Sequence, residues 1–320
     1  MKARSVVLLL VGLAACRAPD PGSTVRLPMG FIPNVQFAPF YVALERGYYA
    51  AEGIDLEFDY SFETEGVKLV GAGELPFSLV SGEQVLLARA QGLPVVYVLA
   101  WWQDYPIAIA APVGGGIQAP EDLAGAQIGI PGAFGASYVG LRALLHSAGL
   151  TEEDIALDSI GFNQVESLIA ERQEAVVVYA NNEPLQLNAR GYPVNVIRVA
   201  DYVDLASNGI LTSESMLAND PDLVRGMLRA TLRGLSDTID DPEAAFEISK
   251  KYIEGLDQLS APDQDLQRAV LTASIEFWKT DRPGYSNPQA WVNMQEVLLA
   301  MEFLVEPMDL SAAFSNEYLP

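Results

Sequence analysis

Aromatic and amide side chains gather in the loops that follow the expected strands of this chain of 320 residues. The run from Pro33 to Tyr41 contains two amides and three aromatic rings, and the adjacent Trp101 and Trp102 follow a later strand. Aromatic rings stack on the faces of a flat heterocycle, while Asn and Gln side chains donate to and accept from its edge. These residues therefore predict the capture of a small heteroaromatic molecule and no catalytic residue.

The candidate ligand-binding residues lie at strand ends or at the starts of the helices that follow. In open α/β sheets, ligands bind outside the carboxyl ends of the strands. Each side chain could instead be an ordinary core or interface residue, but exposed loops rarely collect this many aromatic rings. The expected ligand-binding residues are Asn34, Gln36, Phe37, Tyr41, Ser81, Trp101, Trp102, Ser137, Tyr138, Tyr179, Asn181 and Glu183.

The balance of charge excludes several classes of protein. The chain has 19 Lys and Arg residues against 42 Asp and Glu residues, which gives a formal net charge of −23. A nucleic-acid partner is excluded, because phosphate binding needs clustered cations. Half of the residues are hydrophobic and 19% are charged, so the chain is not intrinsically disordered.

The sequence lacks the common catalytic and metal-binding motifs. One Cys and one His leave no partner for a disulfide, a Cys/His metal cluster or a Cys–His dyad. The motifs GxxxxGK(S/T), GxGxxG, HExxH and GxSxG do not occur, so we expect no cofactor and no metal. His146 on an apolar helix is expected to be half-buried and structural, and the acidic pair Glu63 and Glu65 carries no specificity. Gly114–Gly116 is expected to be a flexible connection between lobes.

The N-terminal segment resembles a bacterial lipoprotein signal. Two cations precede an apolar run, Val6 to Leu13, which is too short to span a bilayer. The run ends in Leu13-Ala14-Ala15-Cys16, which is similar to a lipobox and implies that Cys16 carries lipid, such as palmitate. The alternative is an ordinary secretory signal with an incidental Cys. We expect residues 1–15 to be the signal peptide and residues 16–24 a flexible tether, with the body on the extracytoplasmic face of the cell membrane.

Expected strands and helices alternate along the chain, which predicts an α/β fold with a mostly parallel sheet. From about Glu214 onward the pattern is almost wholly helical. This order is typical of a two-lobed protein whose chain crosses between the lobes and comes back. We expect residues 25–112 to form the first part of lobe 1, residues 113–205 to form lobe 2, and residues 206–320 to return to lobe 1.

Four blocks of sequence resemble the solute-binding proteins of ABC importers. The run FIPNVQFAPFYVALERGYYAAEGIDLEF, Phe31 to Phe58, is most similar to the branch named for thiamine-pyrimidine synthesis, which also holds sulfonate and taurine binders. The blocks Gly73–Ala100 and Pro120–Leu150 and the later Asn182-Glu183-Pro184 match the same family. The resemblance implies a type II periplasmic-binding-protein fold, with two α/β lobes, two crossovers and a ligand cleft that closes by hinge motion.

Within that family, the aromatic-rich run Val35 to Phe40 resembles the riboflavin-binding members. Riboflavin is neutral, which suits an acidic body whose candidate loops contain no Lys or Arg. A thiamine pyrimidine precursor, such as formylaminopyrimidine or hydroxymethylpyrimidine, is the alternative, and other small molecules stay open. Asn34 and Gln36 would read the edge of the heterocycle, and aromatic rings would stack on its faces. The resemblance also implies an ABC permease and its ATPase as partners.

Two other classes of function stay open. Eukaryotic relatives of this fold are suicide synthases that build the thiamine pyrimidine from their own His and use a Cys-rich motif. Here His146 lies away from the first loop and Cys16 is the expected lipid site, so we expect no enzyme. A receptor that senses its ligand and signals through a partner kinase would have the same sequence features as an import protein.

Overall fold

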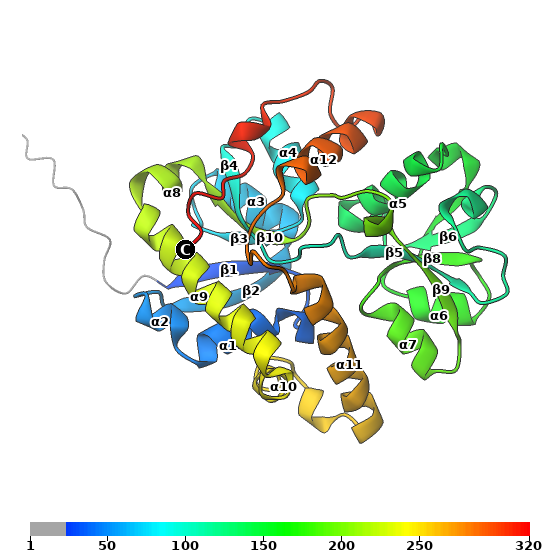
Figure 1. Cartoon of the computed structure of the whole chain (residues 1–320), viewed down its shortest axis with the longest axis horizontal. Coiled ribbons are helices and arrows are strands. Elements are labelled where there is room, and N and C mark those ends of the chain that lie inside the picture. Colours follow the sequence, from blue (N-terminus) through cyan, green and yellow to red (C-terminus); the bar gives the residue numbers. More distant parts are fainter. Residues whose placement is uncertain (1–23) are drawn as a thin grey trace, which may run out of the picture.

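The computed structural model describes residues 24–320, which fold into two α/β lobes side by side (Figure 1). The chain crosses from lobe 1 to lobe 2 between β4 (Val95–Ala100) and β5 (Ile107–Pro112). It returns between β9 (Val194–Arg198) and β10 (Gly209–Ser213). The chain therefore crosses between the lobes twice, as the fold class implies, and the residues after β10 are mostly helical.

The sequence expectations for the N-terminal segment fall outside the described part of the chain. They are the signal peptide over residues 1–15, the lipidation site Cys16 and all but the last residue of the tether over residues 16–24. They remain predictions.

Lobe 1 contains two small sheets. β1 (Val25–Gly30) pairs in parallel with β2 (Leu56–Phe62), and β10 lies between β3 (Ser78–Val80) and β4, antiparallel to both. The helices of this lobe are α1 (Ala38–Glu45), α2 (Tyr48–Ala51), α3 (Glu63–Gly71), α4 (Gly82–Ala90), α8 (Glu214–Asn219), α9 (Pro221–Asp240), α10 (Pro242–Ser249), α11 (Ala261–Trp278) and α12 (Pro288–Ala300).

Lobe 2 is built on one five-stranded sheet with the order β7-β6-β8-β5-β9. β6 pairs in parallel with β7 and β8, and β5 pairs antiparallel with β8 and β9. The remaining strands and the helices of this lobe are β6 (Gln127–Ile130), β7 (Ala156–Ser159), β8 (Ala175–Tyr179), α5 (Gly135–Ser147), α6 (Gln164–Ile169) and α7 (Glu183–Ala189).

Three expectations about this organisation are wrong. Residues 107–112 do not belong to lobe 1, because they form β5 in the sheet of lobe 2. Gly114–Gly116 therefore lies in a turn inside lobe 2 and does not connect the lobes. The sheets are mixed and not mostly parallel, because β5 and β10, the first strand after each crossing, run antiparallel to their neighbours.

The long helix α9 covers α1 and gives lobe 1 much of its core. Asp220 precedes it and accepts a hydrogen bond from Leu223 N at 3.1 Å, which satisfies one of the free N–H groups at the helix start. Buried residues recur every three to four positions along it, the spacing that places them on one face. Gly234 lets the helix approach α1 closely, since a Cβ there would lie 2.1 Å from Pro39 O.

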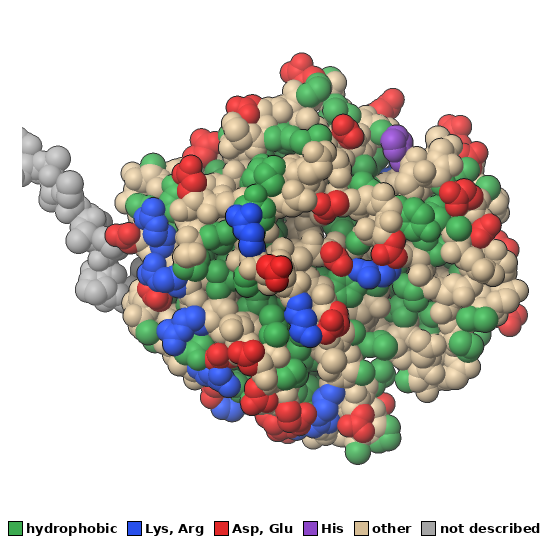
Figure 2. All heavy atoms as spheres, in the orientation of Figure 1, with side chains coloured by type: hydrophobic (Ala, Val, Ile, Leu, Met, Phe, Trp, Pro, Cys, Tyr) green, Lys and Arg blue, Asp and Glu red, His purple; other side chains and the backbone are tan. Residues whose placement is uncertain are grey.

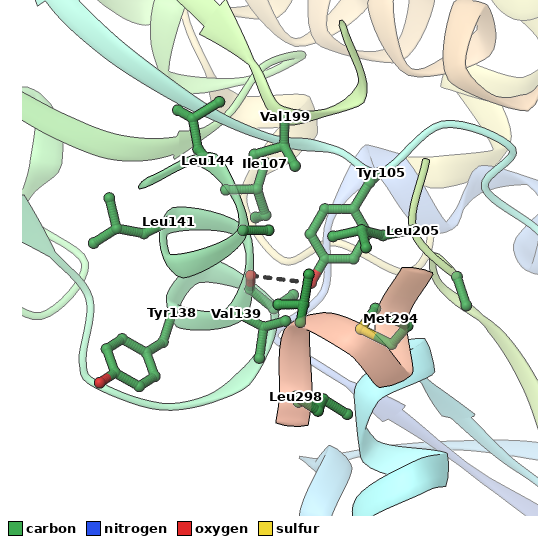
Figure 3. Packing of buried hydrophobic residues seen from close by; sticks show 14 of the residues in the cluster. Tyr105, Ile107, Tyr138, Val139, Leu141, Leu144, Val199, Leu205, Met294 and Leu298 are labelled. Atoms are coloured by element: carbon green, nitrogen blue, oxygen red, sulfur yellow. Dashed lines mark hydrogen bonds between the residues drawn. The ribbon is translucent and has the colours of Figure 1, made fainter. Parts of the chain in front are cut away.

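One apolar core lies within lobe 1, and a second runs across both lobes. The second core joins β3, β4 and α4 of lobe 1 with β5, β6 and α5 of lobe 2, and α12 packs onto both sides. Figure 3 shows this core around Tyr105 and Leu205, one from each crossing segment, with Ile107, Val139 and Met294 beside them. The lobes are therefore held together by apolar contacts along α4, α5 and α12.

Candidate ligand-binding site

The first candidate segment is a short 3-10 helix, η1 (Val35–Phe37), between β1 and α1. Asn34 caps it, with its Oδ1 accepting a hydrogen bond from Gln36 N at 3.0 Å. The Gln36 side chain is buried, with 8% exposed. Phe37 places its ring 5.6 Å from that of Trp101, measured between centroids. The expected edge-reading residues are therefore brought beside the expected stacking residues.

Tyr41 is fully buried one turn further along, in the core of lobe 1. Its ring stacks on Tyr252 at a centroid distance of 4.6 Å, and its hydroxyl lies 3.2 Å from that of Tyr60. Burial and the Tyr60 contact raise its pKa. One face of this ring is thus occupied by another residue of lobe 1, and its edge contact with Phe37 is the connection to the site.

Three indole rings pack against one another where the chain leaves lobe 1, and we name Trp101, Trp102 and Trp278 the tryptophan cluster. Their ring centroids are 5.6, 5.8 and 6.0 Å apart. Trp101 and Trp102 lie on the first crossing segment, and Trp278 ends α11. All three rings are almost completely buried. The second crossing segment fixes the pair, because Asn208 O accepts from both Trp101 N and Trp102 N at 3.0 Å.

The last residue of β8 and the loop after it bring lobe 2 to this cluster. Tyr179 packs its ring edge-on against Trp102, with centroids 6.1 Å apart. Asn181 is fully buried and donates through Nδ2 to Ser274 Oγ at 2.8 Å, one turn before Trp278 on α11. Glu183 accepts a hydrogen bond from Tyr179 N at 2.9 Å, and burial raises its pKa to about 7. Its carboxylate therefore closes the loop that positions Tyr179 and Asn181.

Ser81 lies between the fully buried carboxyl group of Glu83 and the half-buried carboxyl group of Glu63, and we name Glu63, Ser81 and Glu83 the acid network. Ser81 Oγ is 2.7 Å from Glu63 Oε2 and is also hydrogen-bonded to Glu83 Oε1. A hydroxyl has one proton, so it can donate to one carboxyl group and must accept from the other. Burial, and next the charge of Glu63, raise the pKa of Glu83 to about 7. The network therefore holds a proton at moderately acid pH.

The acid network touches the first crossing segment. Tyr105 is buried, and its hydroxyl lies 3.1 Å from Ala136 O at the start of α5 and 3.5 Å from Glu83 Oε2. The contact with Ala136 is drawn as a dashed line in Figure 3. Burial raises the pKa of this hydroxyl, and the charge of Glu83 raises it further. Tyr105 thus links lobe 2 to the carboxyl groups of lobe 1.

Tyr138 and Ser137 are the candidate residues at the start of α5. The Tyr138 ring points away from Tyr105 in Figure 3. Its hydroxyl contacts Glu152 and accepts from Arg142 at 2.9 Å, and its ring lies 5.9 Å from that of Phe303. Ser137 is half-buried in the first turn of α5. The structure therefore does not bring Tyr138 to the tryptophan cluster.

One cation lies closer to the site than the sequence suggested. Arg198, at the end of β9, places its guanidinium 4.9 Å from the ring centroid of Phe277, the neighbour of Trp278. Its charge is balanced by Asp104 at 2.7 Å on the first crossing segment. The single His, His146, is exposed near the end of α5 and not half-buried as expected.

Residues 24–320 contain neither a metal-binding cluster nor a helix suited to span a membrane. No group of His, Cys, Asp and Glu side chains in that range is arranged to hold a metal ion. No helix of the described chain is both long and apolar enough to cross a membrane.

Sequence reasoning missed several residues that the structure places at this site. Trp278, Phe277 and Ser274 were hidden in the regular apolar pattern of α11, and the four Trp residues of the chain were the one available signal. Asn208 stands in a crossing segment without any motif. Glu63 and Glu83 were lost among 42 acidic residues, because burial, which distinguishes them, cannot be read from the sequence.

Two α/β lobes joined by two crossing segments, with a helical return to the first lobe, define the type II periplasmic-binding-protein fold. The aliphatic sulphonate binding protein SsuA of Escherichia coli has the same fold, with a TM-score of 0.72 at 13% identity over 92% of each chain.

A family model described as NMT1/THI5 like matches residues 34–245, and the chain belongs to this family. The riboflavin-binding protein RibY of Chloroflexus aurantiacus is 39% identical to it, over 98% of this chain and 96% of the relative. The formylaminopyrimidine-binding protein of Halalkalibacterium halodurans is 26% identical, over 98% and 97% respectively. These relatives are binding proteins, and the expected family membership is confirmed.

Proposed function

We propose that this protein captures riboflavin outside the cytoplasm and delivers it to the permease of an ABC importer. The observation that carries the proposal is the tryptophan cluster, placed on the crossing segments and α11 and contacted by Tyr179 of lobe 2. The three-ring system of riboflavin offers a long flat face to such rings. The 39% identity to a riboflavin-binding protein supports the same ligand.

The charge of the protein favours a neutral ligand. Figure 2 shows acidic side chains spread over both lobes on the face in view, in keeping with the net charge of −23. A field of this sign disfavours anions such as phosphorylated compounds. Arg198, which could attract an anion, is already paired with Asp104.

Capture requires the lobes to separate and close around the ligand. Trp102 and Tyr179 are in edge contact at 6.1 Å, so a flat ring can enter between them once lobe 2 has turned away. The hinges would lie in the crossing segments, where few residues have to change their backbone angles. Tight binding without chemical conversion is then expected.

A fluorescence titration tests the ligand. The protein is purified from residue 17 onward, which retains every described contact, and is added to riboflavin at constant concentration. Stacking on tryptophan should quench flavin fluorescence at micromolar protein with a 1:1 end point, and the recovered flavin should be unchanged. If flavin fluorescence is not quenched and the protein binds formylaminopyrimidine directly, the thiamine-precursor alternative is supported instead. The relative that is 26% identical, a formylaminopyrimidine-binding protein, favours that alternative.

The anchor and the partner follow from the same proposal. Cys16 would hold the protein at the extracytoplasmic face of the cell membrane through lipid, and the closed form would dock on the permease, which its ATPase drives. Replacing Cys16 with Ser should release the protein from the membrane fraction and abolish labelling by palmitate. Retention of both would contradict the lipid anchor and leave the ligand proposal untouched.

A further inference from the structure

Buried polar atoms without a hydrogen-bond partner gather in and around the tryptophan cluster. The Nε1 atoms of Trp101, Trp102 and Trp278 are among them, and so are the Oδ1 atoms of Asn181 and Asn208. The other such atoms in residues 24–320 are on Ser61, on Gln173 and on Arg198, whose guanidinium lies over the Phe277 ring beside the cluster. Folded proteins leave few buried polar groups unpaired, so a group of five calls for an explanation.

The five residues that carry these atoms belong to one connected region. Asn208 O holds the backbone of Trp101 and Trp102, and Asn208 Nδ2 lies 3.5 Å from the hydroxyl of Tyr179. Asn181 is bonded to Ser274, which is four residues, and therefore one helical turn, before Trp278. Both crossing segments, α11 of lobe 1 and the loop after β8 of lobe 2 thus meet at the tryptophan cluster.

The fourth tryptophan of the chain shows what the other three lack. Trp291 is fully buried in the core that runs across the lobes, and its Nε1 donates to Ser286 Oγ at 2.8 Å. Burial of an indole therefore does not by itself leave its N–H unpaired in this protein.

We propose that the indole N–H groups of Trp101, Trp102 and Trp278 and the amide oxygens of Asn181 and Asn208 read the polar edge of the ligand. Three donors and two acceptors suit an edge that carries more carbonyl and ring-nitrogen acceptors than N–H donors. The dione edge of riboflavin, with one carbonyl group on each side of a single imide N–H, has this composition. An aminopyrimidine would place its amino group, which is a donor, against the indole N–H groups, and two donors cannot form a hydrogen bond with each other. The inference rests on the proposed function and assigns Trp278 and Asn208 to ligand specificity.

The test compares Trp278→Phe with Trp291→Phe in the riboflavin titration. Trp278→Phe keeps an aromatic ring and removes one N–H donor, so the dissociation constant should rise about 2- to 13-fold, as expected for one hydrogen bond. Trp291→Phe makes the same chemical change at a paired indole and should leave the dissociation constant within a factor of two. Asn208→Ala, which keeps the backbone carbonyl that holds Trp101 and Trp102, should weaken binding by a similar factor if Trp278→Phe does not fold.

Thio analogues separate the lost donor from the lost ring area. Sulfur is a weaker acceptor than oxygen, so the effect of Trp278→Phe should shrink with 2-thioriboflavin or with 4-thioriboflavin, depending on which carbonyl group the indole reads. An effect of the same size for riboflavin and both analogues would overturn the inference, as would binding by Trp278→Phe and Asn208→Ala that equals that of Trp291→Phe. If the unchanged protein does not bind riboflavin at all, the proposed function fails and this inference falls with it.

Discussion

The replacement of Glu83 by Gln should make the protein more stable at alkaline pH and change little at acid pH. Glu83 is fully buried in the acid network, and its pKa is raised from an ordinary 4.5 to about 7 by burial and by Glu63. Between these pH values the folded state keeps a proton that the unfolded state has released, so stability falls as pH rises. Gln is neutral at every pH and has nearly the shape of the protonated acid.

The size of the effect follows from the same two pKa values. Each unit of pH across which the folded state alone is protonated contributes about 1.4 kcal/mol. Between pH 5 and pH 8, Glu83 should therefore lower the free energy of unfolding by about 2 to 3 kcal/mol relative to Gln at this position. This destabilisation by Glu83 is fully present above the pKa of the folded state and disappears as the pH falls to 4.5.

Urea unfolding at pH 5, 6, 7 and 8 measures this difference for the wild type and Glu83→Gln. The carboxyl groups outside the acid network give both proteins the same underlying pH dependence, so the difference between the two proteins reports on Glu83 together with its interaction with Glu63. Glu65→Gln is the control, because Glu65 is exposed in the first turn of α3, the helix that also carries Glu63, and the substitution makes the same chemical change outside the acid network. A wild-type-minus-variant difference that stays constant within about 0.5 kcal/mol from pH 5 to pH 8 would refute the buried, protonated state of Glu83.

Two further changes test the packing that positions the site. Gly234→Ala would place a Cβ 2.1 Å from Pro39 O where α9 crosses α1, so it should destabilise the protein by about 1 to 3 kcal/mol in urea unfolding. Gly226→Ala on the same helix would meet only the Glu52 side chain, at 3.2 Å, and should be neutral or mildly stabilising. If both substitutions lowered the free energy of unfolding equally, the close approach of α9 to α1 would be contradicted. Tyr105→Phe removes the hydroxyl between Ala136 O and Glu83, so it should lower the free energy of unfolding in urea by about 0.5 to 1.5 kcal/mol at pH 5. An unchanged free energy of unfolding at every pH would argue against this contact between the lobes.

The fold could be predicted from the sequence because two independent signals agreed. The alternation of strand and helix patterns gave the α/β class, and the block from Phe31 to Phe58 gave the family. The boundary of lobe 1 could not be placed, since Ile107–Pro112 is apolar throughout and a buried strand of this kind fits either sheet. Its partners, β8 and β9, come from sequence far downstream.

The site was predictable where its residues stand in loops and hidden where they stand in helices. Trp101 and Trp102 attracted attention because they follow a strand without belonging to an apolar period. Trp278 occupies a helix position that an ordinary core residue would also fill, so its pattern carries no information about ligand binding. What distinguishes it from Trp291 is a hydrogen bond made by one indole and not by the other.

The same crossing segments carry both the candidate hinges and the candidate site. The first segment places Trp101, Trp102 and Tyr105 within six residues after β4, and the second supplies Asn208 immediately before β10. A rotation of lobe 2 about these segments must therefore change the contacts of the side chains proposed to hold the ligand, such as the edge contact between Trp102 and Tyr179. The contacts of Tyr105 must change in the same rotation, because its hydroxyl lies between Ala136 of lobe 2 and the proton-holding Glu83 of lobe 1.

A ligand that satisfies the buried indole donors in the closed form would stabilise that form by its differential affinity alone. Binding and closure are then one equilibrium, and no separate trigger is needed.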